Sequence, residues 1–253
     1  MSALITSRRL IQLLSIAGGL LLWEGFSRFV VANGLFLAPP SQVLREIVRL
    51  AISGRLGHDL AVSALEFAVG FGIASVLGIV LGFLMASNEA AKEASEPWVQ
   101  AFNATPTVAL APLFILWAGV GIWSKVMMVV IVVIFTISIN TEAGVRQTSP
   151  RLIETFRSFG ATRAQIFLKL SLPSALPMIL AGLKLGTARG LIGVVVAELF
   201  GARAGLGNLI SESAANFDMA GLFSGVLVLA ATGIMLTAVL RWLELRLVPW
   251  QGD

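Results

Sequence analysis

Residues 67–85 read FAVGFGIASVLGIVLGFLM and carry no charged side chain. A helix of about 20 residues is roughly 30 Å long, which is the thickness of the hydrocarbon core of a bilayer. Residues 221–240 form a second uncharged run of similar length. A helix in a soluble enzyme is rarely apolar on every side over this distance. These two segments therefore predict an integral membrane protein.

The overall composition agrees with this prediction. Of the 253 residues, 57% are hydrophobic and 13% are charged, with a mean hydropathy of +0.90, whereas about a quarter of the residues in a soluble domain are charged. The net charge of +4 is small, and we attribute it to orientation in a membrane rather than to nucleic-acid binding. The chain has no cysteine and a single histidine, His58. Disulfides, thiolate catalysis and multi-histidine metal sites are therefore excluded, and we predict no catalytic residue and no metal site.

The chain is predicted to be an all-α membrane protein, with one transmembrane domain over residues 1–253. Apolar runs place about six spans at residues 10–31, 61–86, 99–120, 124–145, 174–199 and 221–242. The first run resembles a signal peptide, but it continues into Glu24 and Arg28, and no convincing small-residue cleavage site follows it. We therefore expect a retained first span, with cleavage as the alternative.

Positive charges are unevenly distributed between the two sides of such a bundle. The side of the N-terminus would carry Arg8, Arg9, Lys92, Arg146, Arg151, Arg157, Arg163, Lys169, Arg241 and Arg246. The opposite side would carry mainly Arg28, Arg45, Arg49, Arg55, Lys125 and Arg203. Because lysine and arginine accumulate in cytoplasmic loops, both termini are predicted to be cytoplasmic.

Small residues recur at every fourth position in two of the predicted spans. The second span has Gly70, Ala74, Gly78, Gly82 and Ala86, and the fifth has Gly182, Gly186 and Gly190, followed by Gly193. Such rows make one face of a helix nearly flat, so that another backbone can come close. They predict tight helix packing, with a direct role in gating as the alternative.

A break at Ala38-Pro39-Pro40-Ser41 is followed by a short helical pattern. Leu44, Ile47, Val48 and Ala51 recur there at helical spacing. The pattern predicts a short helix, either amphipathic on the outer membrane surface or packed as a connector.

The longest polar stretch of the second half, residues 144–173, predicts two short helices joined by a turn. Ser149-Pro150 is a favourable helix start, and Gly160 favours a helix end because glycine readily takes the left-handed conformation. Thr162 and Gln165 have the spacing of a capping box for the second helix, which Pro173 is expected to close. The apolar side chains Leu152, Phe156, Phe159, Ile166, Phe167 and Leu170 would lie against the rest of this subunit or against a second protein.

Within this stretch the sequence resembles a known family. Glu154-Thr155-Phe156, Gly160 and Leu170-Ser171-Leu172-Pro173 are similar to the EAA loop of binding-protein-dependent ABC importer permeases, with the glutamate, the glycine and the final Leu-Pro in register. Thr155 and Phe156 stand where the family has two alanines. Further collinear stretches are similar to the nitrate, sulfonate, taurine and bicarbonate branch: Pro106–Leu113, Gly182–Leu185 and Val196–Gly207. Glu66 departs from that branch, which often has an arginine there.

The resemblance implies a type I ABC importer permease fold in a bacterial cytoplasmic (inner) membrane, with cytoplasmic coupling helices in about residues 148–173. It implies a homodimer or a pair of related permeases, two ATP-binding subunits and an external solute-binding protein. The chain would not be an enzyme by itself. It has no Gly-x-x-x-x-Gly-Lys-Ser/Thr phosphate loop and is expected to hold no cofactor, so ATP and Mg²⁺ would be bound by the partner ATPase. The residues implied in ATPase coupling are Glu154, Arg157, Phe159, Gly160, Arg163, Leu172 and Pro173.

The solute implied by the resemblance is a small oxyanion such as a sulfonate, taurine, nitrate or bicarbonate, moved inward. Polar residues inside spans are candidates for its pathway, because intramembrane polar groups usually face a bundle interior or water. These candidates are Asn103, Thr105, Thr107, Asn140, Arg189 and Glu198. The guanidinium of Arg189 would suit an oxyanion. The alternative is structural, with Arg189 or Lys184 satisfied by Glu198, Glu66 or backbone carbonyls.

Two other functions compete with the importer. A secondary transporter or channel without an ATPase would usually show internal repeats or interrupted helices, and no convincing repeat is found. A membrane-embedded enzyme acting on lipids would need clustered histidines, acidic residues or an activated nucleophile. His58 alone does not provide such a site.

Overall fold

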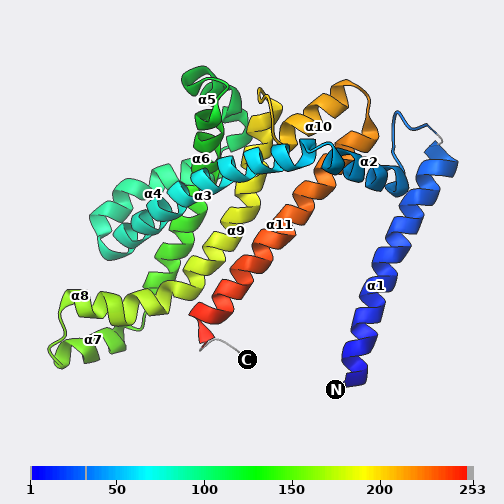
Figure 1. Cartoon of the computed structure of the whole chain (residues 1–253). Coiled ribbons are helices and arrows are strands. Elements are labelled where there is room, and N and C mark those ends of the chain that lie inside the picture. Colours follow the sequence, from blue (N-terminus) through cyan, green and yellow to red (C-terminus); the bar gives the residue numbers. More distant parts are fainter. Residues whose placement is uncertain (1, 32, 250–253) are drawn as a thin grey trace.

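The computed structural model describes residues 2–31 and 33–249, and this part of the chain is helical without any strand (Figure 1). The prediction of an all-α membrane protein is confirmed. Five helical segments are long and apolar enough to cross a membrane. They contain α1 (Ser2–Gly25, extended by the π-helix Phe26–Val31), α3 (Arg55–Ser87), α6 (Ile122–Arg146), α9 (Leu172–Leu199) and α11 (Met219–Leu247). The shorter helices are α2 (Pro40–Ile52), α4 (Glu89–Ala104), α5 (Ala111–Ala118), α7 (Pro150–Ser158), α8 (Arg163–Ile166) and α10 (Leu206–Ala215).

The predicted third span, residues 99–120, is not a continuous helix. α4 ends at Ala104, and the chain resumes as the 3₁₀ turn Thr107–Leu110 and α5, bent by 91° from α4. Pro106 explains the break, because proline has no amide hydrogen and disfavours the helical conformation of the residue before it. Thr105 is accordingly extended, with φ −75° and ψ 136°. Only if this bent pair is counted as one span does the number of spans reach six.

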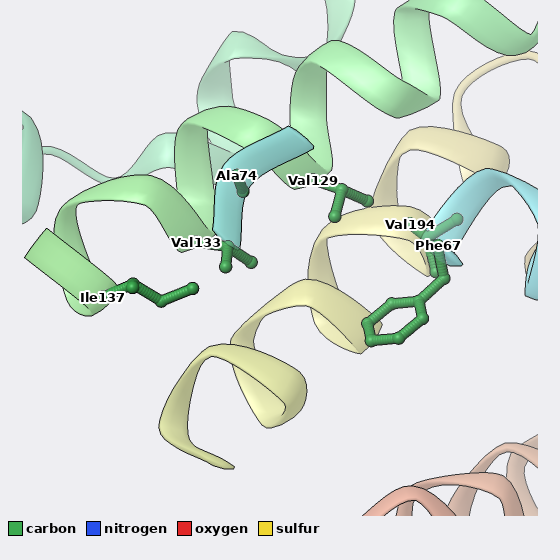
Figure 2. Packing of buried hydrophobic residues seen from close by; sticks show 6 residues of the cluster. All are labelled: Phe67, Ala74, Val129, Val133, Ile137 and Val194. Carbon is green, nitrogen blue, oxygen red and sulfur yellow. The ribbon is translucent and has the colours of Figure 1, made fainter. Parts of the chain in front are cut away.

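α6 is the central helix of the bundle, with α3 and α9 packed closely on either side of it. A Cβ atom added at Gly82 of α3 would lie 2.6 Å from the Ser138 carbonyl oxygen of α6, and one at Gly182 of α9 would lie 2.8 Å from the Asn140 Cβ atom. The packing interpretation of the small-residue rows is therefore confirmed. Figure 2 shows the apolar cluster at this junction, in which Phe67 and Ala74 of α3, Val194 of α9, and Val129, Val133 and Ile137 of α6 are buried.

The N-terminal helices lie at the edge of the bundle. α1 stands apart from the other long helices (Figure 1) and is mostly exposed in the single chain. The Trp23 and Phe223 rings, with centroids 5.3 Å apart, join it to α11. α2 is the short helix expected after the double proline. It packs Val43 and Leu50 inward and leaves Leu44 exposed, so it is a packed connector with a second, exposed apolar side.

Short helices lie at the two opposite ends of the bundle of long helices. The start of α1, the end of α11 and the pair α7–α8 lie at one end of the molecule in Figure 1, whereas α2, α5 and α10 lie at the other. The side chains of Arg8 and Arg9, which contribute to the predicted charge distribution, lie outside the described part of the chain. At the end near α7, Glu142 of α6 lies within 3.3 Å of Lys92 and 3.0 Å of Arg146. The Lys92–Glu142 pair attaches α4 to α6, as does the ion pair of Arg146 with Glu89 of α4 (3.3 Å).

We predict that Gly82→Ala lowers the free energy of unfolding by about 1–3 kcal/mol, since the added methyl group meets the backbone of α6 and cannot be accommodated by a side-chain rotation. Thermal unfolding of the purified protein in a fixed detergent measures the effect. The matched control is Gly72→Ala on the same helix, where an added Cβ atom meets nothing within 4 Å. Equal stability of the two variants would contradict the packing role of the row.

Candidate functional site

The first candidate site is the helical pair α7–α8. α7 starts at Pro150 as predicted, and Gly160 takes a positive φ of +76° in the turn after it. The capping box is present: the Thr162 amide donates to Gln165 Oε1 (2.8 Å), and the Gln165 amide donates to Thr162 Oγ1 (3.3 Å). These local signals give α8 its start and its orientation relative to α7.

The prediction that Pro173 closes the second helix is wrong. α8 continues through a π-helical turn, Phe167–Ser171, into α9, so that residues 163–199 form one helical segment. Pro173 lies in the first turn of α9, where its missing amide hydrogen does not interrupt the helix. The coupling segment is thus joined to a membrane span without a break.

The two short helices differ in how much of their apolar surface is covered. In α8 and the following turn, Ile166 and Leu170 are buried, and the Phe167 ring packs edge-on against Phe83 of α3, with centroids 4.9 Å apart. In α7 no residue is buried, and Phe159 just after it is 87% exposed. The rest of this subunit therefore buries apolar side chains of α8 and the following turn, covers Ile153 and Phe156 of α7 only in part, and leaves Leu152 and Phe159 exposed.

The second candidate site surrounds Arg189 of α9. Its Nη1 atom donates to Asn103 Oδ1 on α4 (3.0 Å) and to Thr136 Oγ1 on α6 (2.8 Å). Beside it lies a cavity of about 250 Å³, lined also by Thr105 and Thr107 at the break between α4 and α5. Four of the predicted pathway residues therefore come together here: Asn103, Thr105, Thr107 and Arg189.

Thr136 was not predicted as part of this site. Threonine in a transmembrane helix is usually an interhelical hydrogen-bond partner, so the sequence gives no signal for a contact with Arg189. The rings of Phe102 and Phe135 also line the cavity and stack with centroids 5.2 Å apart and planes 5° from parallel. Both aromatic residues were likewise missed, because they are indistinguishable from ordinary apolar residues of a span.

Two predicted pathway residues lie elsewhere. Asn140 donates to the Thr136 carbonyl of its own helix (2.8 Å) and lies against Gly182 of α9. Glu198 lies at the opposite end of α9 from α8 and is 1% exposed. Neither residue lines the Arg189 cavity.

The predicted ion-pair partners of the intramembrane cations are also wrong. Lys184 forms its ion pair with Glu244 of α11, and Arg189 has the neutral partners given above. Neither cation is paired with Glu198 or Glu66 in the described part of the chain. The error arises because helix periodicity does not reveal which helix faces which, and Lys184 and Glu244 are far apart in sequence.

Glu198 instead holds the start of α10. Its Oε1 atom accepts from the Ser63 hydroxyl of α3 (2.6 Å), and its Oε2 atom accepts from the Gly207 amide (2.5 Å). The Ser63 hydroxyl accepts from the Leu206 amide (2.8 Å), and Asp59 Oδ1 accepts from the Gly205 amide (3.0 Å). The first amides of a helix have no intrahelical partner, and here buried side chains of α3 and α9 satisfy three of them.

The comparisons with known proteins agree with these features. Residues 75–251 match the family described as the binding-protein-dependent transport system inner membrane component. The chain belongs to this family. It is 35% identical over 92% of both chains to the formylaminopyrimidine transport permease protein ThiX of Halalkalibacterium halodurans. It is also 30% identical to the taurine transport system permease protein TauC of Escherichia coli, over 92% of this chain and 87% of that protein.

Solved structures show the same fold. An inward-facing form of the MetNI methionine ABC transporter aligns over 82% of this chain and 99% of its own, with a TM-score of 0.58 and 19% identity. An amino acid ABC transporter with histidines aligns over 81% of this chain and 96% of its own, with a TM-score of 0.60 and 17% identity. The type I ABC importer permease fold predicted from the resemblance is confirmed.

The protein is thus a multi-pass inner-membrane permease subunit of an ATP-binding-cassette importer. This decides against a secondary transporter, a channel and a lipid-modifying enzyme. Family membership implies that ATP hydrolysis takes place in a separate subunit and that a solute-binding protein delivers the cargo. The interrupted helix at Pro106, which would be typical of a secondary transporter, belongs in this permease to the wall of the Arg189 cavity.

We predict that Ser63→Ala destabilises the permease, because the Oε1 atom of Glu198 and the Leu206 amide each lose the buried Ser63 hydroxyl as a partner, at roughly 1–3 kcal/mol per group. Thermal unfolding in detergent measures the loss. Ser75→Ala is the control, since the Ser75 hydroxyl donates only to the Phe71 carbonyl of the same helix (2.6 Å). The structural role of Ser63 would be refuted by a loss no larger than that of the control.

Proposed function

We propose that this permease works as a homodimer with two ATP-binding subunits and an external solute-binding protein, and imports a small oxyanion. The observation that carries the proposal is the exposed helix α7 with the turn after it, which presents the uncovered apolar residues Leu152 and Phe159 at the same end of the molecule as the start of α1 and the end of α11. ATP and Mg²⁺ are bound by the partner ATPase, and this chain supplies the surface that receives its movement.

α7 and the turn after it have the properties of a docking surface. Leu152 is 48% exposed and Phe159 is 87% exposed, and exposed apolar surface that projects from a membrane domain into water is costly unless a partner covers it. Glu154, Arg157 and Arg163 are exposed around these residues. Aromatic side chains enclosed by charged ones are typical of the energetic centre of an interface. We infer that the ATPase covers Phe159, with Glu154, Arg157 and Arg163 at its edge.

The continuity of α8 with α9 supports a direct mechanical connection. Leu172 and Pro173 lie within the first turn of α9 and are partly buried, so displacement of α8 by the ATPase is transmitted along one helix to Arg189. The π-helical turn at Phe167–Ser171 is the point at which the segment can bend, since single π turns interrupt regular helix geometry. Nucleotide and solute must each bind one conformation of the bundle better, because otherwise neither could shift the equilibrium.

The open face of α9 favours a second copy of the chain. Leu185, Ala188, Arg189 and Ile192 are exposed on this face in the single chain. A guanidinium facing lipid at this depth is expensive, whereas one facing a water-filled interface between two subunits is not. The distribution of lysine and arginine further supports a cytoplasmic location for the termini and for α7–α8.

The choice of an oxyanion as solute rests on Arg189 and on the relatives. TauC is named for taurine, and a putative aliphatic sulfonates transport permease, SsuC of Bacillus subtilis, is 30% identical over 92% of this chain and 84% of that protein. A second candidate is a planar pyrimidine, since ThiX is named for formylaminopyrimidine and the aromatic residues Phe102 and Phe135 line the cavity. Thermal-shift screening of the partner binding protein with both classes of compound distinguishes them.

We predict that Phe159→Ala weakens association with the ATP-binding subunits by about 2 kcal/mol, or roughly thirtyfold, because it removes the most exposed aromatic residue of the docking surface. Co-purification and binding-protein-stimulated ATP hydrolysis measure the loss, while thermal unfolding of the permease stays unchanged. Phe200→Ala, which truncates a 56% exposed phenylalanine at the other end of α9, is the control. Normal assembly of the Phe159 variant would reject the docking surface.

A second prediction concerns the turn itself. Gly160→Val should reduce coupling, because a β-branched residue at a φ of +76° is strained by about 1–3 kcal/mol and would reorient α7 relative to α8. Gly160→Asn serves as the matched control, since asparagine tolerates the left-handed conformation better than valine. The expected result is a larger loss of ATP-coupled uptake for valine than for asparagine. Equal uptake by both variants would show that the geometry of this turn is unimportant.

A further inference from the structure

Arg189 differs from Lys184, Arg55 and Lys125 of the long helices in the nature of its partners. Lys184 has the carboxylate of Glu244, and Arg55 has the carboxylates of Glu212 and Asp59. Lys125 is 2% exposed and donates to the backbone carbonyls of Val120 and Gly121. Arg189 is exposed to a cavity, and within the described residues it has neither a carboxylate nor a backbone carbonyl as partner.

The hydrogen bonds of Arg189 occupy only one part of its guanidinium. Both use Nη1, with Asn103 Oδ1 and Thr136 Oγ1 as acceptors. A guanidinium has five N–H donors in a planar fork, so the donors on Nε and Nη2 are left over, with no acceptor among the residues that the structure describes. The side chain is therefore fixed in position by neutral groups, while its charge and one bidentate edge remain available.

The cavity that Arg189 lines fits a small anion with a short apolar body. Its volume of about 250 Å³ lies below the roughly 300–1,000 Å³ typical of pockets for drug-sized ligands. Thr105 and Thr107 contribute hydroxyl groups, whereas the stacked rings of Phe102 and Phe135 form an apolar wall. No acidic residue lines the cavity, so nothing in its lining repels an anion.

We propose that this cavity is a transient binding site for the solute inside the membrane domain, and that Arg189 binds its sulfonate or carboxylate group through Nε and Nη2. The inference rests on the proposed function, since it assumes that the imported solute is an oxyanion. The fork geometry of arginine matches two oxygens of such a group. The two neutral acceptors of Arg189, Asn103 and Thr136 (its anchors), suit a transient site, because a carboxylate partner would compete with the solute for the positive charge of Arg189.

Because the two anchors lie on different helices, binding of the solute depends on the conformation of the bundle. Asn103 is at the end of α4, just before the break at Pro106, and Thr136 is on the central helix α6. Movement of α9 relative to α4, driven through α8, changes the distance from Arg189 to Asn103 beside this break. The site is therefore complete only in conformations that keep α4, α6 and α9 in register, which gives the solute the differential affinity that transport requires.

The test uses the full-length permease, purified in lipid nanodiscs with whichever subunits it retains. Its thermal unfolding is measured in sodium ethanesulfonate, with sodium chloride at equal ionic strength and the neutral ethyl methyl sulfone as comparisons. Ethanesulfonate should raise the unfolding temperature, since a ligand that binds only the folded state stabilises it, whereas the sulfone should not. No rise in the wild-type protein would overturn the proposal.

Variants identify the group responsible. Arg189→Met should raise the ethanesulfonate concentration needed for the same rise in unfolding temperature by about ten- to a hundredfold. This factor corresponds to the loss of a charge-assisted bidentate pair of hydrogen bonds. Arg189→Lys keeps the charge and loses the fork, and should retain part of the response. The control is Lys184→Met, which removes the other cation inside α9 and should lower the starting stability but keep the response. An unchanged response in both Arg189 variants would overturn the site.

The failure of this inference can be told apart from the failure of the proposed function. Assembly with the ATPase and the binding protein is measured by binding-protein-stimulated ATP hydrolysis. This measurement is independent of the thermal unfolding with ethanesulfonate. An ethanesulfonate response that depends on Arg189 supports the site even if no ATPase co-purifies. If ATP hydrolysis is stimulated but the Arg189 variants respond to ethanesulfonate like the wild type, the importer function is supported and the proposed solute site is rejected.

Discussion

The close contact of α3 and α9 with α6 is the constraint on which the rest of this permease depends. In lipid there is little hydrophobic force to hold helices together, so their association relies on dispersion contacts between surfaces without bulky side chains. Gly190 shows the consequence, because a Cβ atom there would lie 2.9 Å from the Phe67 ring and 3.0 Å from the Val133 side chain. Arg189, which directly precedes Gly190 in α9, is thereby held within hydrogen-bonding distance of Thr136 on α6.

The same packing makes α9 a continuous helical connection between two sites. Its N-terminal end continues from α8, which follows the proposed ATPase contact on α7 and Phe159, and its other end is fixed to α10 by the buried carboxyl group of Glu198. Between these ends Arg189 faces the cavity. A displacement applied at α8 therefore cannot be absorbed by a loop before it reaches the cavity, and the break in the neighbouring segment, at Pro106, is where the wall of the cavity can yield.

The features that could be predicted from the sequence are those set by local geometry. The small-residue rows, the Gly160 turn and the Thr162–Gln165 capping box all depend on residues a few positions apart, and each is found where it was expected. The break at Pro106 was missed because an average of hydropathy over a whole span does not respond to one proline. The partners of Lys184 and Glu198 were missed because they lie on other helices, and no periodicity within one helix indicates which neighbour it faces.

Glu198 and Arg189 illustrate two ways in which a membrane protein keeps an ionisable side chain in its span. The carboxyl group of Glu198 has a structural role: it is buried, and its two oxygens accept from Ser63 and from the start of α10. A structural role for Arg189 would favour a similar arrangement with a carboxylate, because isolated charges at this depth are costly. Its two acceptors are neutral instead, and an arginine whose counter-charge is missing from the described chain is stabilised most when an anion from outside the chain is bound.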